Sequence, residues 1–243
     1  MNNNTKVALV TGAGIRLGKA IAIRLAREGF DLALHYRGSR SEVEDTQRSI
    51  LDLGSKAEIF QSDLSQAEAP AQLARKVMES MGKVDVLVNS AAIFYPTPSL
   101  DESDEHWDAF MDLNLRAPFR LVRHLQQTLR EQGGSIVNIV DIYSHRPLAH
   151  HLPYCVSKGA LWSLTQSLAL QLAPEIRVNA VSPGAALPPA GAPPEVADRL
   201  AVPIPLQRIG CAEDIAQAVS YLVHAPFVTG QMINVDGGRT LKM

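Results

Sequence analysis

Short apolar runs rich in β-branched residues alternate with longer segments of helical period from residue 7 almost to the end of the sequence. Such alternation is typical of a parallel sheet covered by helices on both faces, because parallel strands need crossover connections. We predict strands at Val7–Val10, Asp31–His35, Ala57–Gln61, Val84–Val88, Ser135–Val140, Arg177–Ser182 and Met232–Val235. We predict helices near Leu17–Glu28, Ser41–Leu53, Ala67–Met81, Ser103–Glu131, Tyr154–Leu172 and Ala212–Val223. The predicted fold class is α/β, a doubly wound parallel sheet of seven strands.

The length and charge of the chain narrow its class. A chain of 243 residues without an internal repeat or linker suits one domain, residues 1–243. The net charge of -2, from 23 basic and 25 acidic residues, gives no attraction for nucleic acid or anionic lipid. The first residues lack the apolar core of a signal peptide, and no apolar run approaches the ~18 residues that span a bilayer. We therefore expect a soluble, cytoplasmic protein that acts on a small molecule.

One segment breaks the alternation. Residues 182–205 contain Pro183, Pro188, Pro189, Pro193, Pro194, Pro203 and Pro205. Proline at this density cannot continue a helix or an inner strand. We predict an irregular substrate lid over residues 184–205, with an ordinary surface loop as the alternative.

A glycine-rich turn, Thr11–Gly18, follows the first predicted strand and leads directly into a predicted helix. Glycines let the backbone turn tightly and approach a pyrophosphate, whose charge is favoured by the N–H groups at the start of the helix. The turn therefore predicts a dinucleotide site. A tight connection without a ligand is the alternative.

The end of the second predicted strand indicates which dinucleotide binds. An NAD site usually has Asp or Glu there to hold the ribose 2′-hydroxyl. This chain has Arg37, Gly38 and Ser39 instead. We expect Arg37 and Ser39 to bind a 2′-phosphate, with Arg16 as a further cation, so the predicted cofactor is NADP(H). A solvated basic turn is the alternative.

Asp141, Tyr154 and Lys158 form the candidate catalytic group. Tyr154 and Lys158 are four residues apart and share one face of the predicted helix, and Asp141 precedes Tyr154 by thirteen residues. An ammonium beside a phenol favours the phenolate and lowers its pKa from ~10. We therefore expect Tyr154 to exchange a proton near neutral pH. For the Tyr–Lys pair alone, a packed ring beside a solvated amine is the alternative.

Six motifs, in chain order, resemble the short-chain dehydrogenase/reductase family across essentially the whole chain. They are Thr11–Gly18, Asn89-Ser90-Ala91-Ala92, Asn114, Tyr154-x-x-x-Lys158, Ser182-Pro183-Gly184 and Val235-Asp236-Gly237-Gly238. The resemblance implies a Rossmann-like sheet of order 3-2-1-4-5-6-7. It implies that Tyr154 gives the proton and that Lys158 holds the nicotinamide ribose and lowers the pKa of Tyr154. It also implies that Asn114 supports a proton-carrying water.

The resemblance also implies the dinucleotide site. Asp63 would lie beside the adenine, Asn89 near the adenosine ribose and Pro183-Gly184 beside the nicotinamide. The cofactor-binding residues expected in this way are Gly12, Ile15, Arg16, Leu17, Tyr36, Arg37, Ser39, Asp63, Leu64, Asn89, Ser90, Ala91, Tyr154, Lys158, Pro183, Gly184 and Ala185. The family usually has glycine at the position of Arg16, asparagine at that of Ser90 and serine at that of Asp141. The serine normally bonds a substrate carbonyl, so Asp141 indicates a different substrate.

One branch of the family, the pteridine reductases, is similar to this chain at further positions. The matching segments are Thr-Gly-Ala-x-x-Arg-Leu-Gly, Leu34-His35-Tyr36, Phe94-Tyr95-Pro96-Thr97-Pro98 and Val140-Asp141. This resemblance implies that Arg16 contacts both cofactor and pterin, and that Phe94 stacks the pterin against the nicotinamide. It places Asp141 with Tyr154 and Lys158 in catalysis. The implied substrate-binding residues are Arg16, Phe94, Asp141 and Tyr154.

The chemistry is consistent with that branch. Reduction of a C=N bond in a dihydropterin needs hydride at carbon and a proton at nitrogen, which a carboxyl group of raised pKa can relay. We therefore expect an NADPH-dependent reductase of pterins or dihydropterins, with dihydrofolate as a further candidate. One alternative is an NADPH-dependent reductase of 3-oxoacyl thioesters or other ketones. Another is a cofactor-binding regulator without turnover, which the presence of Tyr154, Lys158 and Asn114 disfavours.

Three further expectations concern metals, thiols and assembly. His145, His150 and His151 have no metal-ligand spacing, so we expect no metal. Cys155 and Cys211 have none either, so both are expected to be reduced. Cys155 is expected to be buried and inert, with a reactive thiol as the alternative. The predicted helix Tyr154–Leu172 has apolar residues on more than one face, which predicts a second chain packed against it. The family resemblance implies a homotetramer.

Overall fold

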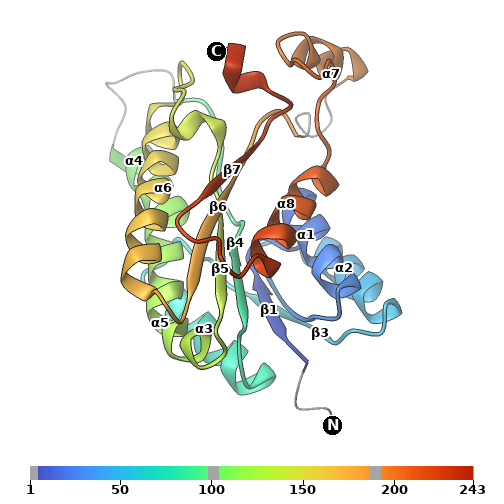
Figure 1. Ribbon diagram of the computed structural model, residues 1–243, viewed down its shortest axis with the longest axis vertical. Coiled ribbons are helices and arrows are strands. Elements are labelled where there is room, and N and C mark those ends of the chain that lie inside the picture. Colours follow the sequence, from blue (N-terminus) through green and yellow to red (C-terminus); the bar gives the residue numbers. More distant parts are fainter. Residues whose placement is uncertain (1–4, 98–103, 187–192, 243) are drawn as a thin grey trace.

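The computed structural model describes residues 5–97, 104–186 and 193–242. These residues form a seven-stranded parallel sheet with the order β3-β2-β1-β4-β5-β6-β7 (Figure 1). The strands are β1 (Val7–Val10), β2 (Asp31–Tyr36), β3 (Ala57–Gln61), β4 (Val86–Asn89), β5 (Ser135–Ile139), β6 (Arg177–Pro183) and β7 (Met232–Val235). The strand order confirms the predicted fold class.

Helices cover both faces of this sheet (Figure 1). They are α1 (Arg16–Arg27), α2 (Arg40–Asp52), α3 (Ala69–Met81), α4 (Asp104–Met111), α5 (Ala117–Glu131), α6 (Leu152–Leu172), α7 (Pro194–Ala201) and α8 (Ala212–His224). Helices α1, α2 and α8 lie on one face, and α3 to α6 lie on the other. In β1, Ala8 and Val10 pack in the core under α1, whereas Leu9 packs in the core under α5. This alternation follows from the two-residue period of a strand.

The predicted helix Ser103–Glu131 is interrupted, and its first residue lies outside the described residues. A π-helical turn, Asp112–Arg116, joins α4 to α5. The cause is Pro118, which has no N–H to bond the carbonyl of residue 114 and would clash with it in a regular helix. The turn instead bonds the Ala117 N–H to the Asp112 carbonyl, one residue further back.

The prediction that the proline-rich segment contains no helix is wrong. Helix α7 begins at Pro194 and is preceded by Pro193 as its N-cap. Proline is tolerated at the first position of a helix because the N–H that it lacks has no partner there. Residues 187–192, in the middle of the predicted lid, lie outside the described residues.

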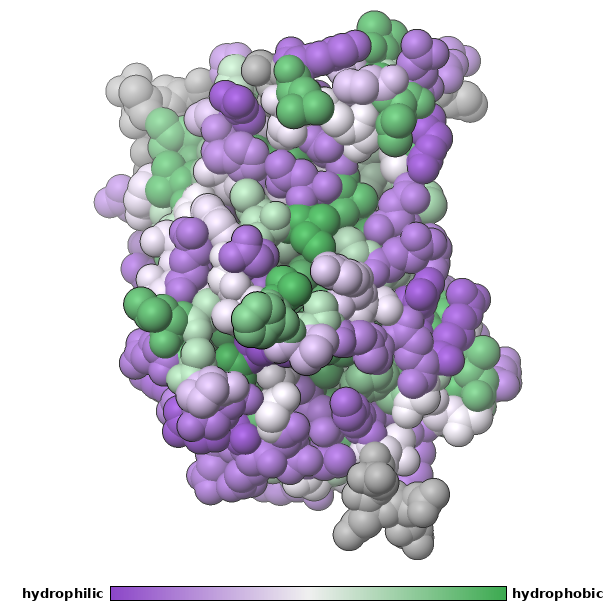
Figure 2. All heavy atoms as spheres, in the orientation of Figure 1, coloured by the Kyte–Doolittle hydropathy of each residue, from purple (hydrophilic) through white to green (hydrophobic). Residues whose placement is uncertain are grey.

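The surface is mostly polar, with one apolar region on the face drawn in Figure 2. Apolar side chains gather near the middle of that face, over β7 and beside α8. Within residues 5–97, 104–186 and 193–242, no helix has the length and apolar character to cross a bilayer. All seven strands point toward the same edge of the sheet, where their carboxyl ends present the loops that form the site.

Candidate active site

The glycine-rich turn lies at the carboxyl edge, between β1 and α1. Thr11 fixes it to the end of β4, because its Oγ1 accepts hydrogen bonds from the N–H groups of Ser90 (2.9 Å) and Ala91 (3.0 Å). Gly12 has φ +68°, and a Cβ there would lie 3.1 Å from the Ala91 Cα. A Cβ at Gly18 would lie 2.1 Å from the Gly12 carbonyl oxygen. The turn is therefore as tight as a pyrophosphate cradle requires.

Arg16 begins helix α1 in the left-handed region, with φ 52°. A non-glycine residue is strained there, which explains why the family usually has glycine at this position. Ile15, the N-cap, and Leu17, the next helical residue, flank Arg16 at the open end of the helix. These residues lie where the helix N–H groups would meet a phosphate.

The basic turn predicted to bind a 2′-phosphate follows β2. Arg37 is exposed and Ser39 is half-buried, whereas Tyr36 is buried. A Cβ added to Gly14 would lie 3.4 Å from the Ser39 carbonyl oxygen, so this turn abuts the glycine-rich turn. Arg37 and Ser39 are thus positioned beside the predicted phosphate site.

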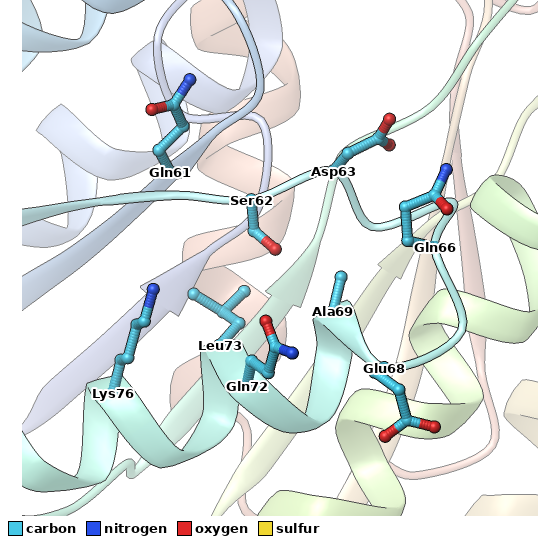
Figure 3. A pocket seen from close by; sticks show the side chains of 9 residues that line it. All are labelled: Gln61, Ser62, Asp63, Gln66, Glu68, Ala69, Gln72, Leu73 and Lys76. Atoms are coloured by element: carbon cyan, nitrogen blue, oxygen red, sulfur yellow. The ribbon is translucent and has the colours of Figure 1, made fainter.

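Asp63 and the buried Leu64 follow β3, and Asp63 lies at the rim of a pocket of about 270 Å³. Figure 3 shows the Asp63 side chain turned away from this pocket, while Ser62 and Gln72 point into it. The Asp63 carboxylate accepts hydrogen bonds from the Ser65 N–H (3.1 Å) and hydroxyl (2.8 Å). Asp63 thus lines the rim of the pocket without pointing into it, and neither Tyr154 nor Lys158 lines it.

Two predicted cofactor residues are fixed by contacts within the sheet. The Asn89 side chain is buried at the end of β4 and donates a hydrogen bond to the Asn138 Oδ1 of β5 (2.8 Å). Gly184 follows Pro183 at the end of β6, and a Cβ there would lie 2.6 Å from the Asp236 Cβ. Gly184 and Ala185 therefore allow β6 to end close against the segment after β7.

Asp141 and Tyr154 are joined directly. The Tyr154 hydroxyl donates a hydrogen bond to the Asp141 Oδ2 (2.8 Å), and the Tyr143 N–H donates one to the Asp141 Oδ1 (2.9 Å). Asp141 follows β5, while Tyr154 is buried in the first turn of α6. Burial raises the pKa of Asp141, and the hydrogen bonds from Tyr143 and Tyr154 oppose this in part. The site thus contains a phenol and a carboxyl group of raised pKa in contact.

Lys158 lies one turn further along α6, fully inside the protein. Its Nζ donates a hydrogen bond to the Ile139 carbonyl oxygen (2.8 Å) and lies 5.9 Å from the centroid of the Tyr154 ring. Burial lowers the pKa of Lys158 to about 8, although the Asp141 carboxylate opposes that shift.

The prediction that Lys158 lowers the pKa of Tyr154 is wrong for the protein without a bound cofactor. Burial, followed by the negative charge of Asp141, raises the pKa of Tyr154 well above its ordinary value. The ammonium faces the ring and the Ile139 carbonyl, whereas the phenol oxygen contacts a carboxylate. The raised pKa keeps the Tyr154 phenol neutral, so the expectation that it exchanges a proton near neutral pH is not met by these side chains.

Asn114 lies on the π-helical turn and fixes the segment after β4. Its Oδ1 accepts the Ile93 N–H (3.1 Å), and its Nδ2 donates to the Ile93 carbonyl (3.3 Å) and to the Ser157 Oγ (3.1 Å). Because Pro118 cannot donate to it, the main-chain carbonyl of Asn114 lacks its usual helical partner.

Phe94 forms an aromatic wall beside the phenol. Its ring is 56% exposed, meets the Tyr154 ring edge-on at 4.7 Å between centroids, and stacks on His151 at 4.8 Å. Sequence reasoning missed this role of His151, because nothing in the sequence shows that the residue before α6 stacks on Phe94. Among the residues that the structure describes, no group of histidine, cysteine or acidic side chains is arranged to hold a metal.

His35 is a second residue whose role was missed. Its buried ring lies under the glycine-rich turn, where Nδ1 accepts the Gly12 N–H (3.2 Å) and Nε2 donates to the Ser62 carbonyl (3.0 Å). The ring must be neutral to accept the first of these hydrogen bonds. Its position in the Leu34-His35-Tyr36 segment was the only available signal.

Fold and site together define an oxidoreductase of the dinucleotide-binding type. A family model described as enoyl-(acyl carrier protein) reductase matches residues 12–240. The chain therefore belongs to the short-chain dehydrogenase/reductase family, whose members use NAD(P)H.

Individual relatives match over nearly their whole lengths. The 3-oxoacyl-[acyl-carrier-protein] reductase FabG of Staphylococcus epidermidis is 33% identical over 96% of this chain and 98% of its own. The crystal structure of acetoin dehydrogenase from Enterobacter cloacae has a TM-score of 0.92 and 35% identity, covering 100% of this chain and 98% of that one. A blue fluorescent protein from a metagenomic library, crystallised with NADPH, has a TM-score of 0.90 and 32% identity over 98% and 99% of the two chains.

Proposed function

We propose that this chain is an NADPH-dependent reductase that transfers hydride to a dihydropterin or a related flat nitrogen heterocycle. The observation that carries this proposal is the 2.8 Å hydrogen bond between the Tyr154 hydroxyl and Asp141. A carboxyl of raised pKa at this place suits protonation of a ring nitrogen better than the usual serine would.

The residues fit NADPH. The glycine-rich turn leaves no room for side chains at positions 12 and 18, as close approach of a pyrophosphate requires. Arg37 and Ser39 are available to a 2′-phosphate, and no carboxylate follows β2. The structural relative crystallised with NADPH supports this choice. When bound, the cofactor supplies the hydride.

The protein supplies the proton. The Tyr154 O–H bond breaks as its proton passes to the acceptor nitrogen, and the electron pair stays on the phenol oxygen. Asp141, whose Oδ2 lies 2.8 Å from that oxygen, then takes a proton from solvent and passes it to the phenolate, which restores both groups. Atoms and charge balance, because hydride and one proton add across the C=N bond. The exposed Phe94 ring, which meets the buried Tyr154 ring edge-on, would stack against a planar ring.

A reductase of 3-oxoacyl thioesters or other ketones is the second candidate, and the relatives favour it over the pterin. The two substrates that appear in the names of these relatives, a 3-oxoacyl chain and acetoin, both carry a ketone. A neutral Tyr154 can protonate a developing alkoxide equally well. A regulator without turnover is disfavoured, because Tyr154, Lys158 and Asn114 converge at one edge of the sheet.

Parallel measurements of NADPH oxidation with dihydrobiopterin and acetoacetyl thioester separate the two acceptors. We expect faster turnover of the pterin by the wild type and a loss of about 10²–10⁴-fold in Tyr154→Phe with NADPH binding retained. Asp141→Ser, which restores the residue usual in the family, should lower pterin turnover and spare or raise ketone turnover. Turnover of the thioester alone would overturn the pterin assignment.

A further inference from the structure

The chain beyond β7 is held in a defined turn. The Asp236 Oδ1 accepts the Gly238 N–H (2.8 Å), and its Oδ2 accepts the N–H (2.8 Å) and the hydroxyl (2.7 Å) of Thr240. These bonds fix a short 3₁₀ helix, Arg239–Lys242. The direction in which Arg239 leaves the turn is therefore set by the fold.

Contacts on two sides place this turn over the carboxyl edge of the sheet. Gly237 and Gly238 have φ of +62° and +86°, and Cβ atoms there would lie 2.6 Å from Ile204 and 2.9 Å from Pro205. On the other side, the close approach of Gly184 to Asp236 ties the turn to the end of β6. Figure 1 shows the C-terminal turn above β6 and β7, on the same edge of the sheet as the loop after β5.

Arg239 lies near enough to Asp141 and Tyr143 for its positive charge to act on both. Burial raises the pKa values of Asp141 and Tyr143, and the positive charge of Arg239 lowers both again in part. Yet no described carboxylate lies within ion-pair distance of Arg239. Its Nε is inaccessible to solvent and has no hydrogen-bond partner among the described residues. A buried donor left unpaired is costly, so an acceptor from outside the chain is expected to meet it.

We propose that Arg239 is a substrate-binding residue whose guanidinium donates hydrogen bonds to a carbonyl or anionic oxygen of the hydride acceptor. The guanidinium presents a planar fork of N–H donors, which suits an oxygen in the plane of an amide or enolate. The acceptor class is therefore a planar molecule with such an oxygen near its reducible bond. This inference deepens the proposed function and rests on turnover at Tyr154, but it does not depend on which of the two acceptors is natural.

The first test compares three variants with the wild type. Arg239→Met removes the donors, Arg239→Lys keeps the charge without the fork, and Lys242→Met removes an exposed charge from the same turn as the control. KM, kcat and the Kd for NADPH are measured with whichever acceptor the wild type reduces. We expect KM to rise about 10–100-fold in Arg239→Met and less in Arg239→Lys, with NADPH affinity within about twofold. The control should match the wild type.

A second measurement distinguishes binding from a structural role. Pterin and 2,4-diaminopteridine differ in one oxygen, which is replaced by an amine in the second. Titrated into the NADPH complex, Arg239→Met should lose affinity for pterin and keep its affinity for the diamine. Equal losses for both ligands, a KM within twofold of the wild type, or a matching loss of NADPH binding would overturn the role of Arg239.

The two proposals fail separately. A wild type that reduces only acetoacetyl thioester overturns the pterin assignment. The role of Arg239 is then tested by the KM of Arg239→Met for that thioester. A wild type that reduces dihydrobiopterin, with Arg239→Met unchanged in KM, overturns the role of Arg239 alone. Turnover of neither acceptor overturns both.

Discussion

The imidazole of His35 accepts a hydrogen bond from the main chain of Gly12, so one buried ring supports the turn predicted to hold the cofactor phosphates. Burial lowers the pKa of His35 to about 4. The neutral ring is therefore part of the architecture of the site, and its protonation would remove the acceptor that Gly12 uses.

His35 should make stability fall in mild acid. Above pH 6.5 the ring is neutral in both the folded and the unfolded chain, and between pH 6.5 and 4 only the unfolded chain takes up the proton. The free energy of unfolding should lose about 3 kcal/mol over that window from this residue. Urea unfolding of wild type and His35→Gln at pH 7 and pH 4 measures the effect. Their difference should shrink in acid, whereas an exposed control, His145→Gln, should show no such change.

Arg37 should discriminate between the nicotinamide cofactors. Arg37 is exposed in the turn whose Ser39 carbonyl abuts the glycine-rich turn, so Arg37→Ala should weaken NADPH binding about 10–100-fold and leave NADH binding nearly unchanged. Arg40→Ala is the matched control, because the Arg40 Nε is already paired with Glu44 at 2.8 Å. The Kd values of the wild type and both variants for NADPH and NADH are measured by cofactor fluorescence. Equal losses for NADPH and NADH would contradict a 2′-phosphate contact.

Arg16 should lower the stability of the fold and strengthen the binding of cofactor and acceptor. Replacing it by glycine relieves a left-handed backbone at φ 52°, which should raise the free energy of unfolding by about 1 kcal/mol. The same change should weaken NADPH and acceptor binding if the side chain contacts both. Gln207→Gly, at φ 54°, provides a control that should gain stability without losing affinity. Unaltered affinity in Arg16→Gly would remove Arg16 from the site.

The outer side of α6 should be an interface between subunits. Leu152, Val156 and Leu170 are exposed on this helix, and Leu170 is 85% exposed. We propose a homotetramer in which a second copy covers them. Leu170→Arg should reduce the mass found by light scattering at micromolar concentration. Leu51→Arg, at a 51% exposed position on α2, should not. A wild-type monomer would refute the proposal.

The strands could be predicted well because their signal is local. The bounds of β1, β3 and β7 agree with the predicted ones, and burial on both faces makes β1 a continuous apolar run. Asp141 and Tyr154 could likewise be paired, because each lies at the carboxyl edge. The raised pKa of Tyr154 could not be foreseen, because it depends on how deeply the folded chain buries the phenol beside Asp141. Arg239 was missed because only tertiary contacts carry the C-terminal turn back over the site.

The extra residue in the π-helical turn changes which way the two helices beside it face. One inserted residue rotates the next helix by about 100° around the helix axis. Phe110 of α4 consequently reaches the Tyr154 ring, at 6.0 Å between centroids, while Leu121 and Leu125 of α5 face the core beneath the sheet. Pro118→Ala would let a regular helix form through residue 114. Helix α4 would then be rotated about its axis, and Phe110 would lose its contact with the Tyr154 ring.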